Sequence, residues 1–163
     1  MSTGLSGLNC LSRNRFFVGI IGAGEADAGL TELARAVGRG IAEMGAVLVC
    51  GGMDGVMSAA CQGAKEKGGV TVGILPGAEK FEANPYVDIA IATGLGEARN
   101  LVIIRTADIL VAIGGSYGTL SEIGFALKMG KRVIGLKTWQ IDGIIQANSI
   151  EQVLRLIKQK EHR

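Results

Sequence analysis

Short apolar runs alternate with segments of helical periodicity from Phe16 to the end of the chain, and this alternation restricts the fold more than any other feature. The runs are almost continuously hydrophobic, which is typical of strands in a parallel sheet that helices cover on both faces. We predict strands at 16–22, 46–50, 70–76, 87–92, 108–115 and 132–136. Helices are predicted within 30–45, 51–69, 96–107, 119–130 and 149–160. This order predicts a doubly wound α/β domain with a mainly parallel sheet of about six or seven strands.

The composition is that of one compact domain. The chain has 163 residues, of which 48% are hydrophobic and 20% charged, so it can bury a core without disulfides or metals. Residues 1–15 are polar and lack the apolar centre of a signal peptide, and we expect them to form a flexible N-terminal tail. Residues 16–163 are then expected to form a single Rossmann-like domain.

The composition also disfavours several classes of function. The net charge is +2, the basic residues are scattered and aromatic residues make up 4%, so no nucleic-acid partner is expected. No apolar run approaches the roughly 18 residues of a membrane span, so no membrane partner is expected. His162 is the one histidine, which argues against a metal site or a histidine-based catalytic triad. Three cysteines without C-x-x-C spacing favour reduced thiols and a cytoplasmic location.

Glycine-rich turns follow nearly every predicted strand. Ligands bind beyond the carboxyl ends of the strands in an open parallel sheet, and bare N–H groups at helix starts bind phosphate. A single turn of this kind could simply tolerate glycine, but several at one edge favour a phosphate site. The residues expected there are Gly22, Gly24, Gly51, Gly52, Gly94, Gly114, Gly115, Ser116, Tyr117, Gly118 and Thr119.

Two common nucleotide-binding motifs are missing. A dinucleotide site needs G-x-G-x-x-G after the first strand, but Asp27 follows Gly22 and Gly24 where the third glycine belongs. The second strand ends in Cys50-Gly51-Gly52 and offers no ribose-binding acid. The chain also has no G-x-x-x-x-G-K-[ST] sequence. NAD and P-loop chemistry are therefore not expected.

The motifs that remain resemble those of the LOG-like superfamily, long mislabelled as lysine decarboxylases. The resemblance covers about residues 16–136 and includes Arg99. It rests on "GGMDGVM" (51–57), "GILPG" (73–77), "NPY" (84–86), "TGL" (93–95) and "ADILVAIGGSYGTLSEI" (107–123). Phosphoribohydrolases of the superfamily carry P-G-G-x-G-T-x-x-E and "HERK", whereas this chain has Ile113 at the proline and "GEARN" at 96–100. In both respects it is similar to the small branch that includes the molybdenum cofactor carrier proteins.

The resemblance implies an enzyme that hydrolyses nucleoside 5′-monophosphates to base and ribose 5-phosphate. Cleavage of the ribose–base bond passes through an oxocarbenium-like state, and the Glu122 carboxylate would either stabilise that charge or position a water. Arg99 would orient the phosphoribosyl group, Asn100 would join it in binding, and no cofactor would be required. The resemblance also implies a homodimer or homotetramer, which light scattering would test.

The same residues allow other interpretations. A non-catalytic carrier or sensor of a phosphorylated pterin or nucleotide needs the phosphate site but not Glu122, and molybdenum cofactor would then be a carried ligand. Thr119-x-x-Glu122 also matches a helix capping box, in which Glu122 bonds the Thr119 N–H. Arg99 could pair with Glu97 instead of a ligand phosphate. Residues 137–143 are expected to form a loop in which Trp139 covers the core.

Overall fold

The computed structural model describes residues 15–159. Its seven-stranded sheet has the order β4-β3-β2-β1-β5-β6-β7, and all neighbouring strands are parallel. This confirms the predicted doubly wound α/β class. The strands are β1 (Phe17–Gly22), β2 (Val47–Cys50), β3 (Val70–Leu75), β4 (Ile89–Ala92), β5 (Ile109–Ile113), β6 (Val133–Leu136) and β7 (Ile145–Ala147). The expected tail at 1–15 lies outside the described residues except for Arg15.

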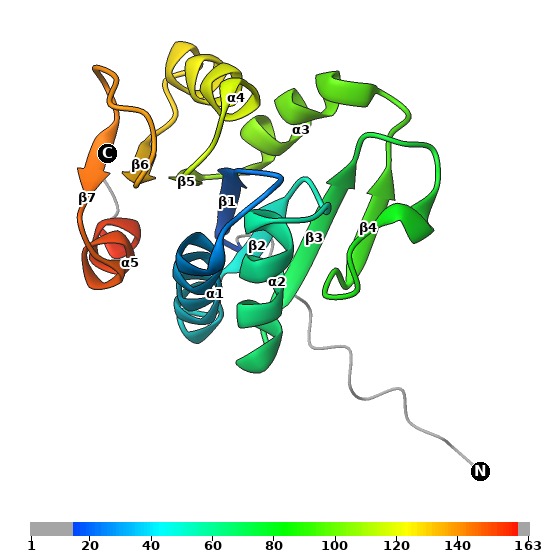
Figure 1. Ribbon diagram of the computed structural model, residues 1–163. Coiled ribbons are helices and arrows are strands. Elements are labelled where there is room, and N and C mark those ends of the chain that lie inside the picture. The colour runs from blue at the N-terminus through cyan, green and yellow to red at the C-terminus, as the bar shows by residue number, and fades with distance from the viewer. Residues whose placement is uncertain (1–14, 160–163) are drawn as a thin grey trace.

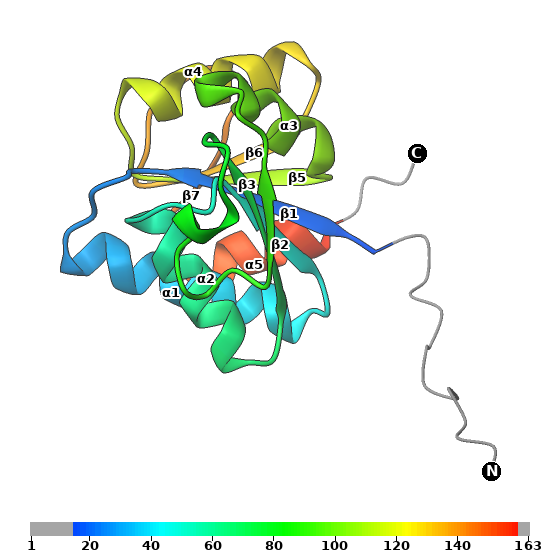
Figure 2. The same ribbon diagram turned by 90° about the vertical axis from the view of Figure 1, so that its right-hand side faces the viewer.

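Among the described residues, five α-helices cover the two faces of the sheet (Figures 1 and 2). They are α1 (Ala28–Glu43), α2 (Val56–Glu66), α3 (Arg99–Thr106), α4 (Tyr117–Lys128) and α5 (Ile150–Lys158). Helices α1, α2 and α5 pack on one face in one hydrophobic cluster, and α3 and α4 pack on the other face in a second cluster. No helix within residues 15–159 is long and apolar enough to cross a membrane.

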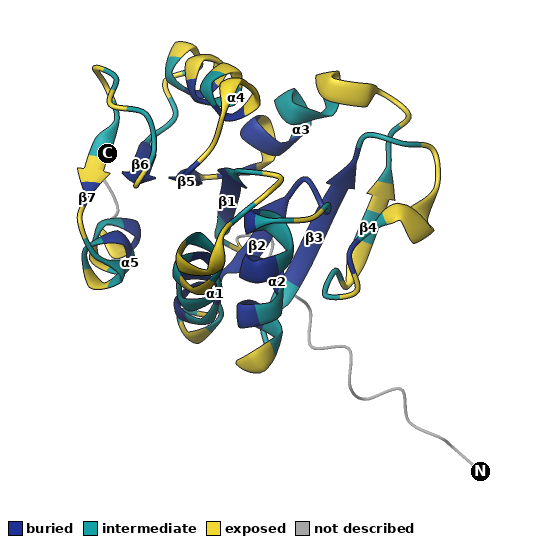
Figure 3. Ribbon diagram, viewed as in Figure 1, coloured by how far each residue is buried: buried dark blue, intermediate teal, exposed yellow. Residues whose placement is uncertain are grey.

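Strand β5 explains why the predicted strands are continuously apolar. Ile109, Val111 and Ile113 belong to the cluster under α1, α2 and α5, whereas Leu110 and Ala112 belong to the cluster under α3 and α4. Successive side chains of a strand point to opposite faces, and helices cover both faces here. All five residues are therefore buried, as the dark blue of the central strands in Figure 3 shows.

The structure differs from the sequence-based prediction at three elements, two of them at the carboxyl edge of the sheet and one the outermost strand. The predicted helix at 96–107 begins as a 3₁₀ turn at Gly96–Ala98 and becomes α-helical at Arg99. Helix α4 begins two residues earlier than predicted, with Ser116 as its N-cap. Strand β7 was not predicted, because three residues with one exposed member give no clear periodicity.

Candidate functional site

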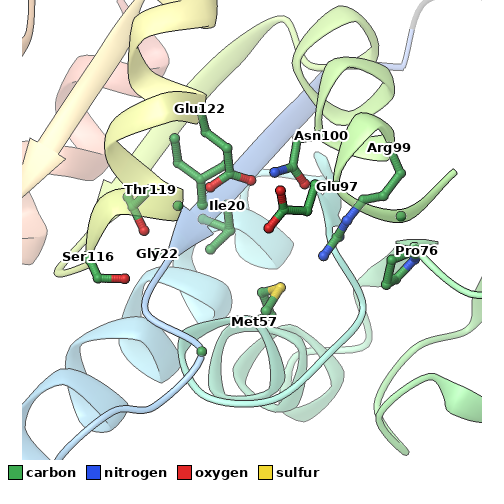
Figure 4. Close-up of a pocket in the computed structure, with 14 residues that line it drawn as sticks. Ile20, Gly22, Met57, Pro76, Glu97, Arg99, Asn100, Ser116, Thr119 and Glu122 are labelled. Carbon is green, nitrogen blue, oxygen red and sulfur yellow. The ribbon is translucent and has the colours of Figure 1, made fainter.

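A cavity of about 340 Å³ opens at the carboxyl edge of the sheet. The strand order reverses between β1 and β5, and this is the place where open α/β sheets bind ligands. Loops after β1 and β3, the start of α3 and the first turns of α4 surround the cavity (Figure 4). Its lining residues are Ile20, Ile21, Gly22, Gly24, Met57, Pro76, Gly96, Glu97, Arg99, Asn100, Ser116, Gly118, Thr119 and Glu122.

One wall of the cavity is formed by Ser116, Gly118 and Thr119, which belong to the turn that leads into α4 (residues 114–119), called the cradle from here on. Gly114 and Gly115 have φ values of 57° and 111°, which side chains rarely adopt, and a Cβ on Gly115 would collide with the Thr119 side chain. This tight turn brings Ser116 to the N-cap position in extended geometry. The first N–H groups of a helix have no partner within it, and together with the helix dipole they form an anion site. The cradle can therefore hold a phosphate group.

Arg99 faces the same cavity from the first turn of α3. Its Nη1 donates a hydrogen bond of 2.9 Å to the carbonyl of Ile74, at the end of β3, whereas its buried Nε has no partner. Burial lowers the pKa of Arg99, and the negative charge of Glu122 acts in the opposite direction. No ion pair joins Arg99 to Glu97 within residues 15–159. An unpartnered buried donor on a cation favours an anionic ligand.

Gly51 leaves room for the Arg99 guanidinium. A Cβ at this position would overlap Nη1 of Arg99, and the neighbouring atoms of the guanidinium would be 2.6 and 2.8 Å away. The backbone of Gly51 does not have a positive φ. Glycine is therefore needed here for close approach, rather than for an unusual backbone conformation.

Replacement of Gly51 with alanine is expected to displace Arg99 from the cavity. Loss of a charge-assisted hydrogen bond should weaken the binding of AMP or inorganic phosphate about tenfold or more. Isothermal titration calorimetry measures this change. Gly124→Ala on α4 is the matched control, because its added Cβ meets no atom within 4 Å. Equal affinities for Gly51→Ala and wild type would show that Arg99 does not need this position.

Glu122 projects from α4 into the cavity (Figure 4). Burial raises the pKa of its carboxyl group to about 7, although the positive charge of Arg99 opposes the shift. The capping-box interpretation is wrong, because Ser116 is the N-cap and Thr119 already lies inside the first turn. Glu122 is therefore a partly protonated carboxyl group at neutral pH, beside an arginine and a helix N-terminus.

Asn100 adds a second unpartnered polar group. Its Oδ1 atom is buried and accepts no hydrogen bond, and the residue lines the cavity next to Arg99. A buried hydrogen-bond acceptor without a partner lowers the stability of the fold. A hydroxyl or amino group of a ligand would satisfy it.

The structure brings most of the predicted site residues together. Those that line the cavity are Gly22, Gly24, Arg99, Asn100, Ser116, Gly118, Thr119 and Glu122. Gly51, Gly52, Gly94, Gly114, Gly115 and Tyr117 are not among the lining residues. Tyr117 is 80% exposed and lines a neighbouring groove of about 580 Å³ with Phe125 and Leu101.

Sequence reasoning missed six of the lining residues: Ile20, Ile21, Met57, Pro76, Gly96 and Glu97. Met57 lies in the first turn of α2, where a single methionine is typical of packing. Glu97 stands in the "GEARN" segment, and its proximity to Arg99 in the sequence suggested an ion pair instead. Within residues 15–159, no three His, Cys, Asp or Glu side chains form a group that could hold a metal ion.

The parallel sheet with a cavity at its switch point defines a Rossmann-like ligand-binding domain. The chain belongs to the SLOG cluster4 family, whose model matches residues 15–163. This confirms the resemblance to the LOG-like superfamily. An uncharacterized protein of Archaeoglobus fulgidus is 52% identical over 120 residues, which are 74% of this chain and 79% of that protein.

Two solved structures are similar over nearly the whole fold. The molybdenum cofactor binding protein from Rippkaea orientalis is 39% identical with a TM-score of 0.85, over 90% of this chain and 98% of that one. The molybdenum cofactor carrier protein of Chlamydomonas reinhardtii is 34% identical with a TM-score of 0.83, over 90% and 98% of the two chains.

Proposed function

We propose that this protein binds and carries a phosphorylated ligand of the molybdenum cofactor type. The observation that carries the proposal is the unpartnered, buried Nε of Arg99 in a cavity shared with the N-terminus of α4. The phosphate would bind the free N–H groups of the cradle and the arginine. The similar structures from Rippkaea orientalis and Chlamydomonas reinhardtii support this ligand class.

The other polar groups of the cavity fit the remainder of such a ligand. The Oδ1 atom of Asn100 would accept a hydrogen bond from a ring amino or amide group of the pterin. The half-buried side chain of Met57 would pack against its flat ring. The volume of about 340 Å³ lies within the range usual for small-molecule sites.

Hydrolysis of nucleoside 5′-monophosphates is the second candidate function. It is favoured by the Glu122 carboxyl group, which has a pKa of about 7 and shares the cavity with Arg99. Ionised Glu122 would stabilise the positive charge that develops on the ribose ring during cleavage. Arg99 and the cradle would hold the 5′-phosphate in either function. The difference between the two functions therefore rests on Glu122.

Incubation of the protein with AMP and with molybdopterin separates the two functions. A carrier is expected to show a higher melting temperature with molybdopterin and no release of adenine from AMP. Glu122→Gln should leave the ligand-induced shift largely unchanged. Adenine release that disappears in Glu122→Gln would establish the hydrolase instead. If neither compound binds or reacts, both candidate functions are wrong. Self-association and a cytoplasmic location stay predictions.

A further inference from the structure

We propose that Trp139 and Thr138 are positioning residues of the phosphate site, because they orient the peptide groups of the cradle. They belong to the β6–β7 loop (residues 137–144), which follows β6 and ends at β7. The inference rests on the proposed function. It assigns a binding role to a segment that contributes no side chain to the cavity.

Three contacts join the β6–β7 loop to the cradle. The Thr138 hydroxyl donates a hydrogen bond of 2.5 Å to the carbonyl of Gly114. The Trp139 indole N–H donates one of 3.1 Å to the carbonyl of Ser116. The rings of Trp139 and Tyr117 also pack together, with centroids 5.9 Å apart and planes at 35°. The loop therefore contacts three of the first four residues of the cradle.

Because the peptide bond is planar, a contact to a carbonyl of the cradle also restrains the N–H group of the next residue. A carbonyl and the N–H of the next residue belong to one rigid peptide plane and point in opposite directions. The carbonyl of Ser116 accepts the helical hydrogen bond of 3.0 Å from the Leu120 N–H, and the Trp139 indole N–H adds a second bond to the same oxygen, so Trp139 further restrains the direction of the Tyr117 N–H, the first of α4. By holding the carbonyl of Gly114, Thr138 fixes the Gly115 N–H. Each N–H group then points away from the side chain that holds the carbonyl of its own peptide plane.

The loop itself is well anchored, so it can hold the cradle in place. Gln146 on β7 donates a hydrogen bond of 3.1 Å from its Nε2 to the carbonyl of Trp139. Lys137 adopts a φ of 51° at the start of the loop, which bends the chain back sharply. A Cβ at Gly135 would lie 2.9 Å from the side chains of both Thr138 and Ile144. The loop thus packs closely on β6.

The contacts with the β6–β7 loop make the backbone of the cradle less flexible. Ser116 supplies no side-chain hydrogen bond to cap α4, so the start of the helix has its backbone bond from Leu120 to Ser116 but lacks the usual side-chain cap. The indole N–H of Trp139 adds a restraint on the Ser116 carbonyl from outside the helix. A ligand then binds to N–H groups that are already oriented, and less conformational entropy is lost on binding.

Paired substitutions test this inference against the binding of inorganic phosphate and AMP. Trp139→Phe keeps a flat ring beside Tyr117 but removes the indole N–H, and Thr138→Val removes the hydroxyl at nearly constant shape. Each should weaken phosphate and AMP binding about two- to tenfold. Thr138→Ser keeps the hydroxyl and should bind as wild type does. Gln140→Ala is the control within the loop, because Gln140 is exposed and lies beside Trp139 without a contact to the cradle.

A second readout separates positioning from general destabilisation. The affinity for adenosine, which lacks the phosphate, should change less than twofold in every variant that binds AMP more weakly. The chain has one tryptophan, so its single indole N–H signal in the NMR spectrum should shift when phosphate is added.

Either of two results would overturn the inference. If Trp139→Phe and Thr138→Val both bind phosphate and AMP as tightly as wild type, Trp139 and Thr138 have no positioning role. The proposed function would be unaffected by that result. A wild-type protein that binds neither compound would overturn the phosphate site itself. If Trp139→Phe fails to fold, the comparison of phosphate affinity between Thr138→Val and Thr138→Ser tests the positioning role.

Discussion

Arg99→Met is expected to weaken the binding of AMP, inorganic phosphate or molybdopterin by about 30-fold or more, the usual cost of removing one partner of a buried charge pair. The guanidinium is half-buried, hydrogen-bonded to Ile74 through Nη1 and unpartnered at Nε. A phosphate in the cavity would satisfy Nε and neutralise a charge that burial disfavours. Methionine keeps much of the apolar side-chain volume but offers neither donor nor charge.

The stability of the Arg99→Met variant should change little. The substitution removes one hydrogen bond, but it also removes a positive charge whose pKa burial already lowers, so the two effects oppose each other. Calorimetric titration gives the affinity and thermal unfolding gives the stability. Arg105→Met on the same helix is the matched control, because it makes the same charge change at an exposed position.

The comparison of the two arginine variants separates a specific contact from a general electrostatic effect. Arg105→Met should bind AMP nearly as wild type does, because exposed charges at a distance are screened by salt. Equal loss in both variants would mean that net charge governs binding. Unchanged binding in Arg99→Met would show that Arg99 does not contact the phosphate.

Much of this site could be predicted from the sequence because its parts are local. The Gly114–Thr119 stretch follows an apolar run and precedes a helical pattern, so it predicts a strand-to-helix turn with free N–H groups. The carboxyl ends of parallel strands meet at one edge, which also explains why Gly22, Gly24 and Arg99 reach one cavity. These inferences need only the order of the elements.

The features of the site that the sequence did not predict depend on contacts between segments far apart in the chain, or on the residue at which a helix begins. The position of Gly51 against Arg99 joins two turns that only the folded sheet brings together. The capping-box interpretation of Glu122 failed because the T-x-x-E pattern alone does not locate the N-cap, which the turn at Gly114 and Gly115 places at Ser116. The β6–β7 loop has no periodic pattern, and its contacts to the cradle are tertiary.

Glu122→Gln is expected to make the folded protein more stable at pH 8 by about 3 kcal/mol, with little change near pH 4. Burial raises the pKa of this carboxyl group to about 7, from an ordinary value of 4.5. Between these two values the unfolded chain releases the Glu122 proton and the folded chain keeps it. The contribution of Glu122 to stability therefore falls as the pH rises from about 4.5 to 7 and stays low above that. Glutamine carries no charge at any pH and avoids this loss.

Urea unfolding of wild type and Glu122→Gln at a series of pH values measures the effect. The difference between the two free energies of unfolding isolates Glu122, because groups such as Asp88, whose pKa is lowered, contribute equally to both proteins. Glu97→Gln is the matched control, since Glu97 also lines the cavity but is exposed, and its curve should run parallel to that of wild type. A wild-type advantage at pH 8 would mean that Glu122 makes a favourable charged contact. The expected result would instead identify Glu122 as a group whose ionisation destabilises the fold, as is common for side chains that serve a ligand site.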